Sequence, residues 1–424
     1  MEVKNYNYRV VDKKIELYLK LFGSILIEGP KWCGKTRSAK HNANSEFLLA
    51  DSKGNFNNKR LALINPNIAL QGDYPRLVDE WQEVPSIWDA VRSEVDKDNK
   101  KGKFILTGSA TINKNEYIHS GCGRIARIKM RTMSLYESGH SDGKVSLKDI
   151  CNGKLGDILT GEVNLEDLLN YIVVGGWPAL SDSKIEENYY IAREYINNVL
   201  SEDIVKIDNV KRDEHKMKLL MCSLARNEAT TVTNKRLKED IKEKDSNDVS
   251  IDSITEYLNV LKNLYLTENI PPFFTKFRSS LRIKQSEKRH FVDPSLPCAL
   301  LNLTKDKLME DLEFAGFLFE SLVERDLLTY VDSFNAKLFH YQDYNNNEID
   351  SVIELEDGSW CGVEIKLGAH QIDDAARNLI KVNNKIIENG GKGAKQLIVI
   401  CGLTNAAYKR DDNVYVVPIT SLKE

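Results

Sequence analysis

The sequence predicts an α/β protein of several domains: a mostly parallel sheet first, a helical middle part, and a second α/β domain at the end. The chain has 424 residues, which is too long for one ordinary hydrophobic core. In its first part, short apolar runs alternate with helix-length stretches, as in sheets built from strand-helix-strand units. Near the end, two apolar runs flank Asp357-Gly358, a pair typical of a turn between strands.

Composition narrows the class of protein. With 42% hydrophobic and 29% charged residues, the chain has the composition of a soluble globular protein. Its formal net charge of -4 gives no general attraction to nucleic acid or acidic membranes, so such binding needs local basic patches. No segment approaches the roughly 18 apolar residues of a membrane span, and the N-terminus lacks a signal-peptide pattern. Seven scattered cysteines without a C-x-x-C pair indicate neither disulfides nor a zinc site. We therefore expect a cytoplasmic protein without a membrane partner.

The first strand-like run, SILI, leads into the segment GPKWCGKT, which fits the phosphate-binding pattern G-x-x-x-x-G-K-T. In such a loop, main-chain N–H groups surround phosphate oxygens, Lys35 reaches the terminal phosphates, and Thr36 binds Mg²⁺. A chance glycine-rich turn is the alternative, which the following helix-like stretch disfavours. We predict ATP and Mg²⁺ as ligands. The predicted loop consists of Gly29, Pro30, Lys31, Trp32, Cys33, Gly34, Lys35 and Thr36.

Two later strands supply the remaining parts of a nucleotide site. RLVDEWQEV places Asp79 and Glu80 directly after an apolar run, the Walker B arrangement, in which the aspartate holds magnesium and the glutamate polarises the attacking water. KFILTGSAT ends a further strand in Thr107-Gly108-Ser109. Because ligands collect at the carboxyl ends of parallel strands, we expect Ser109 or Thr107 to sense the γ-phosphate.

The ordered motifs together resemble bacterial and archaeal AAA-type ATPases fused to a C-terminal domain of unknown function with a restriction-endonuclease-like core. The resemblance is carried by GPKWCGKT, LVDEWQ, FILTGSAT, GRIARIKMRTMSLYESG, VGGWPAL, SLARNEAT, KRHFVDPSL, LEFAGFLFESLVERDL, EIDSVIELEDGSWCGVEIKLG and DNVYVVPI. It implies an AAA+ P-loop NTPase core in residues 1–140, a helical lid or linker in 141–210, a winged-helix domain in 211–297 and a restriction-endonuclease-like domain in 298–424.

Two arginines in the segment GRIARIKM, which includes the strand-like run RIARIKM, are candidates for an arginine finger. Arg124 and Arg127 are equal candidates to reach a γ-phosphate, either their own or that of a neighbouring subunit. A finger acting on a neighbour requires a homo-oligomer, which we expect. For Arg127, which alternates with Ile128 along the strand, a solvated basic face is the alternative.

The middle part reads as three helices followed by two strand-like segments, the order of a winged helix-turn-helix. The third helix carries an apolar stripe that we expect to be core, made of Ile251, Ile254, Leu258 and Leu261. Its exposed positions are poor in basic residues, so major-groove reading is doubtful. The wing is basic through Lys276, Arg278, Arg282, Lys284, Lys288 and Arg289. Phosphate contact and a solubilising loop are equally supported by this cluster.

The last part carries the residue types of a PD-(D/E)xK nuclease. A helix bears Glu320, and a hairpin bears Asp350 followed by Glu364-x-Lys366. Asp350 and Glu364 can share a Mg²⁺ ion that polarises a phosphodiester, and Lys366 can orient or deprotonate the attacking water. Solvated charges on an amphipathic hairpin are the alternative.

Strand geometry makes this arrangement checkable. Both apolar sets face one core only if Asp350 and Glu364 lie on the same sheet face, whereas a two-residue turn at Asp357-Gly358 would pair Asp350 with Ile365. We therefore predict an odd-length loop or a bulge, with Gly358 in the left-handed region.

Two functions follow from these patterns. The first is an ATPase coupled to nucleic-acid processing, with DNA as the expected nucleic acid. In this function, Glu80, Ser109, Arg124 and Arg127 serve ATP hydrolysis. In it, Glu320, Asp350, Glu364 and Lys366 serve phosphodiester cleavage. The second is a nucleotide-dependent switch whose nuclease fold is inactive and binds a protein or nucleic acid without cutting it.

Overall fold

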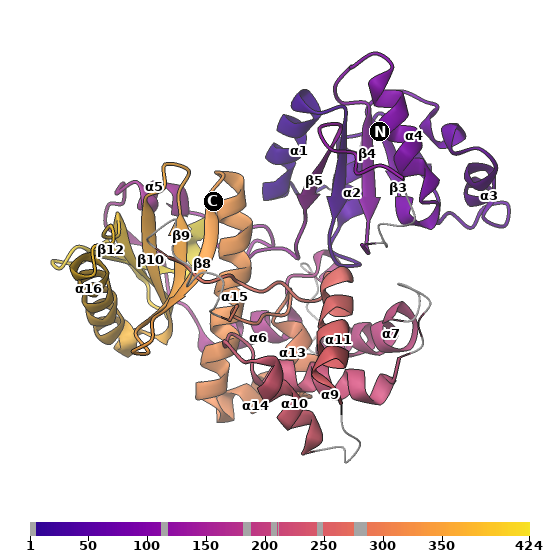
Figure 1. Cartoon of the computed structure of the whole chain (residues 1–424). Coiled ribbons are helices and arrows are strands. Elements are labelled where there is room, and N and C mark those ends of the chain that lie inside the picture. The colour runs from indigo at the N-terminus through magenta and orange to yellow at the C-terminus, as the bar shows by residue number, and fades with distance from the viewer. Residues whose placement is uncertain are drawn as a thin grey trace. The chain divides into compact units, whose positions relative to one another are not determined.

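The computed structural model describes residues 6–111, 118–180, 188–204, 210, 212–243, 249–274 and 286–424. They form two compact units, which we treat separately (Figure 1). The first unit comprises Met1–Thr132, Glu202–Arg212 and Val260–Leu266, and the second comprises Met133–Ser201, Asp213–Asn259 and Thr267–Glu424.

A parallel sheet of five strands forms the centre of the first unit. Its strands are β1 (Ser24–Glu28), β2 (Ser45–Leu48), β3 (Arg76–Asp79), β4 (Phe104–Gly108) and β5 (Ile125–Lys129). They are ordered β2-β3-β4-β1-β5, and each neighbouring pair is parallel. The mostly parallel sheet predicted for this part of the chain is confirmed. The carboxyl ends of β1, β3 and β4 therefore meet at one edge of the sheet.

Helices cover both faces of this sheet. On one face, α1 (Val10–Leu21) and α2 (Lys35–His41) pack against isoleucines of β1, β4 and β5. On the other face lie α3 (Asn57–Ile64) and α4 (Ser86–Asp96). Burial of apolar side chains on alternating sides of each strand produces these three layers, because successive strand residues point to opposite faces.

A mixed sheet of seven strands forms part of the second unit. Its strands are β7 (Ile158–Leu159), β8 (Lys337–Gln342), β9 (Glu348–Glu354), β10 (Trp360–Gly368), β11 (Gln396–Leu403), β12 (Ala406–Lys409) and β13 (Val414–Pro418), in the order β7-β12-β13-β11-β10-β9-β8. The strands β8, β9 and β10 form an antiparallel meander, and β10, β11 and β13 are parallel. The sheet thus combines a hairpin-connected half with a crossover half.

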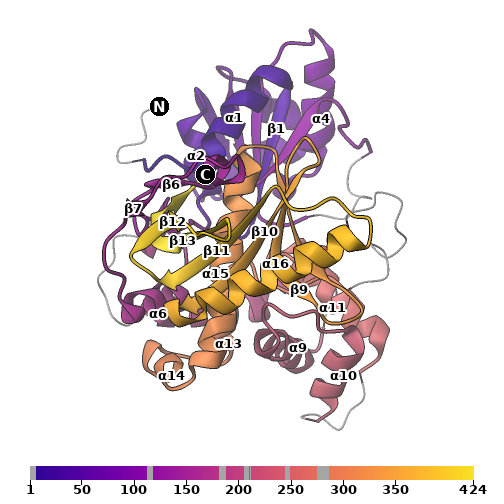
Figure 2. The same cartoon turned by 90° about the vertical axis from the view of Figure 1, so that its left-hand side faces the viewer.

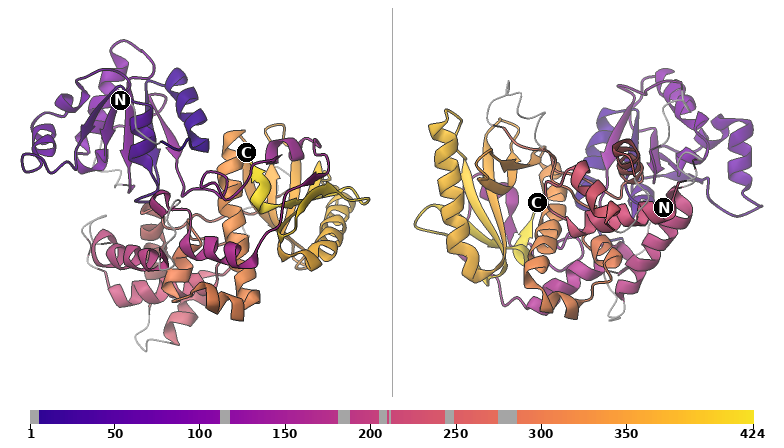
Figure 3. Two further views of the ribbon diagram at one scale, coloured as in Figure 1. Left: turned by 180° about the vertical axis from the view of Figure 1, so that it is seen from behind. Right: turned by 60° about the horizontal axis from the view of Figure 1, so that its bottom comes forward.

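Two long helices enclose this sheet. α15 (Leu312–Ser333) packs on one face and α16 (Ile372–Glu388) on the other. Figure 2 shows α16 lying across β10 and β11, and the left panel of Figure 3 shows the sheet between the two helices. α15 is buried around much of its circumference, including the polar residues Glu324, Arg325 and Asp326. Such buried charges need partners inside the protein.

The hairpin register agrees with the prediction. Cys361 pairs with Ile353 and Val363 with Ser351, so the same register sets Asp350 opposite Glu364. Residues 355–359 form the connecting loop between β9 and β10. Gly358 has a φ of 75°, which is the left-handed conformation that glycine favours. The odd-length loop thereby brings both carboxylates to one sheet face.

The remaining helices of the second unit come from the middle of the chain. They are α5 (Leu147–Cys151), α6 (Leu165–Val174), α7 (Tyr189–Asn198), α9 (Glu214–Arg226), α10 (Asn234–Lys242), α13 (Ser295–Leu300) and α14 (Lys305–Glu310). The segment 141–210, predicted to be a helical lid, also contains short strands. β6 (Val145–Ser146) pairs with β14 (Leu422–Lys423), and β7 pairs with β12. This segment therefore contributes helices and also two short strands, each of which pairs with a strand from the C-terminal part of the chain.

The predicted third helix of the middle part is α11 (Ile251–Asn263). Ile254 and Leu261 are fully buried as predicted, but Ile251 is 40% exposed. The prediction is wrong for Ile251, because it begins the helix and the buried face continues through Tyr257 and Val260 instead. Residues 267–270 pair with 288–291 through isolated bridges. The winged-helix assignment stays a prediction, and Lys276, Arg278, Arg282 and Lys284 lie outside the described residues.

All seven cysteines are free thiols, five of them buried. Within the described ranges, none of the helices combines the length and apolar character needed to span a bilayer.

Candidate functional site

The predicted phosphate-binding loop follows β1 and leads directly into α2. Gly34 has a φ of 99° and Trp32 a φ of 68°, so the chain reverses through left-handed conformations that glycine adopts without strain. At Gly29, a Cβ would lie only 2.1 Å from the carbonyl oxygen of Met130. Glycine is therefore required there by the close approach of two backbone segments.

Lys35 is buried within this loop. Its ammonium donates hydrogen bonds to the carbonyl oxygens of Gly29, at 3.0 Å, and Pro30, at 2.7 Å. Two neutral acceptors balance a full positive charge only in part, so an anion next to the loop is electrostatically favoured. The N-terminus of α2 contributes a partial positive charge to the same place.

An arginine that the sequence analysis did not single out supports the loop from behind. Arg9 is 4% exposed, and its guanidinium donates to the carbonyl oxygens of Cys33 and Arg131, both at 3.0 Å. The planar guanidinium can bridge two carbonyls at fixed spacing. Arg9 thus ties the phosphate-binding loop to the segment that follows β5. No local motif marks it, since its partners are distant in the sequence.

The metal-binding candidates Thr36 and Asp79 are in contact. Thr36 donates its hydroxyl hydrogen to Asp79 Oδ1 at 2.8 Å, and Thr107 donates to the same oxygen at 2.7 Å. Burial raises the pKa of Asp79, although the two hydroxyl hydrogen bonds oppose this effect. A hydroxyl and a carboxylate beside a phosphate loop are suitable oxygen ligands for Mg²⁺. Thr107 therefore helps to hold Asp79 in place, and γ-phosphate sensing by Ser109 or Thr107 stays a prediction.

The candidate base Glu80 lies next to Ser109. Ser109 donates to Glu80 Oε2 at 2.7 Å, and Gln82 donates to the same oxygen. The backbone of Glu80 adopts a φ of 56°, which is costly for a residue with a side chain and is found mainly where structure or function requires it. Its main-chain N–H donates to Thr107 Oγ1 at 3.0 Å. Gln82 was missed by the sequence analysis.

Of the two finger candidates, Arg127 lies on β5 and forms an ion pair with Glu28 at 2.8 Å. Glu28 immediately precedes the phosphate-binding loop, and Tyr265 also donates to it, at 3.0 Å. The guanidinium of Arg127 further stacks over Trp88 at 5.2 Å. Arg127 is thus close to the loop but engaged with a carboxylate of its own chain.

Arg124 lies elsewhere. It precedes β5, whose first residue pairs with Ser24 at the start of β1, so it is at the amino edge of the sheet. Its guanidinium forms an ion pair with Asp96 at 2.9 Å. The loop leaves the opposite, carboxyl edge of β1. The structure therefore does not bring Arg124 to the nucleotide site of its own chain.

In the second unit, the structure brings Asp350, Glu364 and Lys366 together. The ammonium of Lys366 lies 2.9 Å from Asp350 Oδ2 and 2.8 Å from Glu364 Oε2. Asp350 also accepts from the main-chain N–H of Ile365 at 2.8 Å, and Glu364 from Asn378 at 3.0 Å. Burial raises the pKa of Glu364, and the nearby charge of Asp350 adds to this effect. We call these three charged residues the Asp-Glu-Lys cluster.

Glu320 is held by a buried lysine. Lys288 lies 2.5 Å from Glu320 Oε1 and 2.9 Å from Glu324 Oε1, and it donates to the carbonyl oxygen of Asp350 at 2.7 Å. Burial raises the pKa of Glu320, while Lys288 opposes this effect. Lys288 was expected either to contact phosphate or to lie on a solubilising loop. It does neither, because three acceptors in the protein interior surround its ammonium.

The buried network continues to a histidine and a third carboxylate. His290 Nε2 lies 2.9 Å from Glu324 Oε2, a charge contact that falls short of hydrogen-bond geometry, and Nδ1 lies 3.2 Å from Glu228 Oε1. Burial alone would lower the pKa of His290, but Glu324 and Glu228 outweigh it and raise the value to about 9. Arg289, the other described basic residue of the predicted wing, donates to Asn234 Oδ1 at 2.8 Å.

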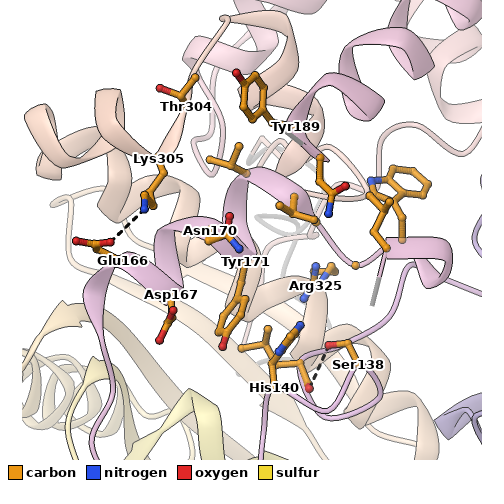
Figure 4. A pocket seen from close by; sticks show the side chains of 18 of the residues that line it. Ser138, His140, Glu166, Asp167, Asn170, Tyr171, Tyr189, Thr304, Lys305 and Arg325 are labelled. Carbon is orange, nitrogen blue, oxygen red and sulfur yellow. Dashed lines mark hydrogen bonds and ion pairs between the residues drawn. The ribbon is translucent and has the colours of Figure 1, made fainter. Parts of the chain in front are cut away.

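A pocket of about 500 Å³ lies elsewhere in this unit, between α6, the start of α14 and Arg325 (Figure 4). His140 stacks on Tyr171 with ring centroids 4.2 Å apart, and burial, assisted by the charge of Arg325, lowers the pKa of His140. Arg325 itself is paired with Asp293, at 3.2 Å, and Asp326, at 2.8 Å. The pocket is rich in polar groups, but the charge of Arg325, which lines it, is already balanced by these two carboxylates.

Three family comparisons match successive parts of the chain. An AAA domain matches residues 22–139, which include the loop, Asp79, Glu80 and Ser109. The first unit has an α/β AAA-type fold. Residues 165–307 match a domain of unknown function (DUF8612), and residues 315–422 match another (DUF4143). A search of curated proteins gave no match.

Several solved structures share limited similarity. The replication initiator DnaA bound to AMPPCP and single-stranded DNA is 12% identical, with a TM-score of 0.26, covering 60% of this chain and 86% of that one. A variant of Thermotoga maritima RuvB is 16% identical, with a TM-score of 0.26, covering 62% and 89%. The Pyrococcus furiosus Hef helicase domain is 11% identical, with a TM-score of 0.20, covering 98% and 94%. The AAA assignment rests on the family match and the parallel sheet, not on these low scores.

The two metal-binding predictions differ in how well the residues fit. In the AAA domain, Thr36 and Asp79 offer adjoining oxygens beside the loop. In the Asp-Glu-Lys cluster, the ammonium of Lys366 bridges the carboxylates of Asp350 and Glu364. Nowhere in the described ranges do three or more His, Cys, Asp or Glu side chains converge as metal ligands would. A cation could join the cluster only if Lys366 moved from between the two carboxylates.

Proposed function

We propose that the AAA domain binds ATP with Mg²⁺ and hydrolyses it. The observation that carries this proposal is the hydrogen-bonded set at the carboxyl edge of the sheet, where Thr36 and Thr107 converge on Asp79. Buried Lys35 lies in the loop that begins α2. These residues come from two separate strands and one helix N-terminus, and the AAA family match supports the same use.

Each side chain then has a distinct task. Lys35 exchanges its two loop carbonyls for oxygens of the terminal phosphates, and Thr36 and Asp79 hold the metal. Bound Mg²⁺ neutralises phosphate charge and favours attack at phosphorus. Glu80 accepts a proton from the attacking water, while Ser109 and Gln82 fix the orientation of its carboxylate.

An arginine finger acting between subunits is part of the same proposal. Arg124 is remote from the loop of its own chain, so its candidate role is in a homo-oligomer, where it would reach a neighbour's γ-phosphate. Arg127 would first have to leave Glu28. Comparing ATPase activity across protein concentrations for Arg124→Ala and Arg127→Ala distinguishes the two, because a finger in trans makes activity depend on assembly.

For the second unit, the proposed activity is Mg²⁺-dependent phosphodiester cleavage of nucleic acid, with DNA as the first substrate to test. Support comes from the sheet order and the Asp-Glu-Lys cluster. An antiparallel meander enters a parallel crossover, α15 and α16 cover the two faces, and Asp350, Glu364 and Lys366 meet on one face. This agrees with a restriction-endonuclease-like arrangement.

A specific observation favours the rival function, a switch with an inactive nuclease fold. Lys366 bridges both carboxylates of the cluster, and Lys288 is paired with Glu320, so each of the three carboxylates has a cationic partner without a metal. Cleavage assays with Mg²⁺ or Mn²⁺ on wild type and Lys366→Ala separate the two functions. Cleavage that disappears in the variant supports the nuclease. Cleavage by neither protein, with ATP hydrolysis retained, supports the switch.

A further inference from the structure

Tyr265 belongs to the first unit although it lies far outside the stretch that matches the AAA family. It stands two residues after the end of α11, within the residues 165–307 that match a domain of unknown function. Residues Val260–Leu266 are nevertheless part of the first compact unit, and Tyr265 is buried there. A distant part of the chain thus adds a tyrosine to the unit that carries the nucleotide site.

The phenol hydroxyl of Tyr265 joins two segments at the carboxyl edge of the parallel sheet. It donates to Glu28 Oε2 at 3.0 Å and lies 2.8 Å from Thr111 Oγ1. Burial raises the pKa of Tyr265, and the charge of Glu28 adds to this effect, so the phenol keeps its hydrogen. Because that single hydrogen is used on Glu28, Thr111 is the donor in the second contact. A chain of hydrogen bonds therefore runs from Thr111 through Tyr265 to Glu28.

Both ends of this chain adjoin groups proposed to act in ATP hydrolysis. Glu28 is the last residue of β1 and immediately precedes Gly29, where the phosphate-binding loop begins. Thr111 follows two residues after Ser109, which donates to the candidate base Glu80. The phenol hydroxyl therefore ties the start of the loop to the segment that follows β4.

The backbone position of Tyr265 is one that favours glycine. The main-chain N–H of Leu266 donates to the carbonyl oxygen of Leu261 at 2.9 Å, and that of Tyr265 donates to Lys262 at 3.0 Å. This is the Schellman pattern at a helix end, in which the left-handed residue is usually glycine. Tyr265 takes that place with a φ of 56°, which is costly for a residue with a side chain. Such a cost is found mainly where structure or function needs the side chain.

We infer that Tyr265 is a positioning residue for ATP hydrolysis, supplied to the AAA domain by the matched region of unknown function. This inference rests on the proposed ATPase function. Tyr265 acts through Glu28 and Thr111, and so keeps the loop that carries Lys35 in register with the segment that holds Glu80. Register matters because a displacement of about 1 Å between reacting groups can lower a rate about 100-fold.

The same hydroxyl bears on the finger candidate Arg127. Glu28 accepts from Arg127 at 2.8 Å as well as from Tyr265. If Arg127 left Glu28 to reach a γ-phosphate, Tyr265 would remain as a donor, and the carboxylate would not be left without a partner. Tyr265 therefore lowers the cost of releasing Arg127.

The test separates turnover from nucleotide binding in the full chain. Steady-state hydrolysis gives kcat and KM, and calorimetry with ATP and Mg²⁺ gives the dissociation constant. Tyr265→Phe removes only the hydroxyl and should lower kcat about tenfold, the rate equivalent of one hydrogen bond to a charged group. The dissociation constant should change less than about threefold, because the groups that hold the phosphates remain. A purely structural role would lower thermal stability but leave kcat unchanged.

Thr111→Val is the second variant, since it removes the other hydroxyl at nearly constant size. It should also lower kcat. The double variant should lose no more than Tyr265→Phe alone, because both hydroxyls act in one chain of hydrogen bonds. If Tyr265→Phe fails to fold, Thr111→Val decides: a lowered kcat supports the inference and an unchanged one overturns it.

Tyr18→Phe is the matched control. It makes the same substitution on α1 of the same unit, where the hydroxyl of Tyr18 has no hydrogen bond to the described part of the chain. Its kcat should equal that of wild type. An equal fall in Tyr18→Phe would overturn the inference, because the effect would then not depend on the contacts with Glu28 and Thr111.

Turnover by Tyr265→Phe equal to that of an active wild type would also overturn the inference, and it would leave the proposed ATPase intact. Absence of hydrolysis by wild type is a different result. It would reject the proposed ATPase and this inference together.

Discussion

The ammonium of Lys288 lies 2.9 Å from the carboxylate of Glu324 in the interior of the second unit. Lys288 belongs to the stretch matched by one family of unknown function, and Glu324 to the stretch matched by the other. The contact joins the pairing of residues 267–270 with 288–291 to α15. A shared charge network therefore links the two matched regions within the second unit, to which most of both belongs.

Replacing Lys288 with methionine should destabilise the second unit strongly. Glu320 would then lose its cation and Glu324 would keep only its charge contact with His290, and breaking a buried ion pair from one side costs about 3–5 kcal/mol. Urea unfolding of Lys288→Met would measure this loss. Lys305→Met removes a partly exposed ion pair with Glu166 and should cost no more than about 1 kcal/mol. Similar losses in both variants would contradict the role of Lys288.

Lys35→Ala should weaken ATP binding on the order of 10- to 100-fold, since charge-assisted hydrogen bonds contribute roughly 1.5–3 kcal/mol. Isothermal titration calorimetry with ATP and Mg²⁺ measures the change. Lys31→Ala is the control from the same loop, because Lys31 is half exposed and paired with Asp203 at 2.5 Å. Unchanged ATP affinity in Lys35→Ala, or no heat at all with wild type, would refute the nucleotide site.

Glu80→Gln should retain ATP binding but lower the hydrolysis rate about 10²- to 10⁴-fold, because it removes only the base. Glu83→Gln lies three residues further on, in an exposed ion pair with Lys59, and should hydrolyse ATP normally. Ser109→Ala and Gln82→Ala should lower kcat while leaving nucleotide affinity largely intact, since both act through the carboxylate of Glu80. Equal turnover by Glu80→Gln and wild type would exclude Glu80 as the base.

Local patterns sufficed to predict the parts of the site that lie next to one another along the chain. The phosphate-binding loop follows from glycine spacing after a strand, and the pairing of Asp350 with Glu364 follows from the period of two along β-strands. Both appear in the structure.

The contacts that escaped prediction join distant segments. Arg9 reaches Cys33 and Arg131, and Lys288 reaches two glutamates of α15. From sequence alone, a lysine in a basic stretch resembles a surface residue, because its burial depends on partners brought together only by the tertiary fold. Arg124 shows the converse: it is near the strand in sequence but lies at the opposite edge of the sheet from the loop.

The buried charge network of Lys288, Glu324 and His290 also predicts that the stability of the protein depends on pH. This dependence originates at His290. Its pKa is about 9 in the folded protein against an ordinary 6.5, so the folded state binds this proton more tightly. The stabilisation is complete below about pH 6.5, falls as the pH rises, and is lost above about pH 9. At 1.36 kcal/mol per pKa unit, it amounts to about 3 kcal/mol at most.

Urea unfolding of wild type and His290→Gln between pH 6 and 9.5 isolates this contribution, because the other titrating groups largely cancel in the difference. The stability gap between the two proteins should narrow as the pH rises. His340→Gln is the control: burial lowers the pKa of His340 to about 4, so this side chain is neutral in the folded state over the whole range. In the unfolded state it loses its proton around pH 6.5, so above about pH 7.5 the stability difference between His340→Gln and wild type should stay constant. If the stability difference between His290→Gln and wild type is equally independent of pH, His290 is uncharged in the folded protein. Lys288 would then be the only cation that stabilises the carboxylate of Glu324.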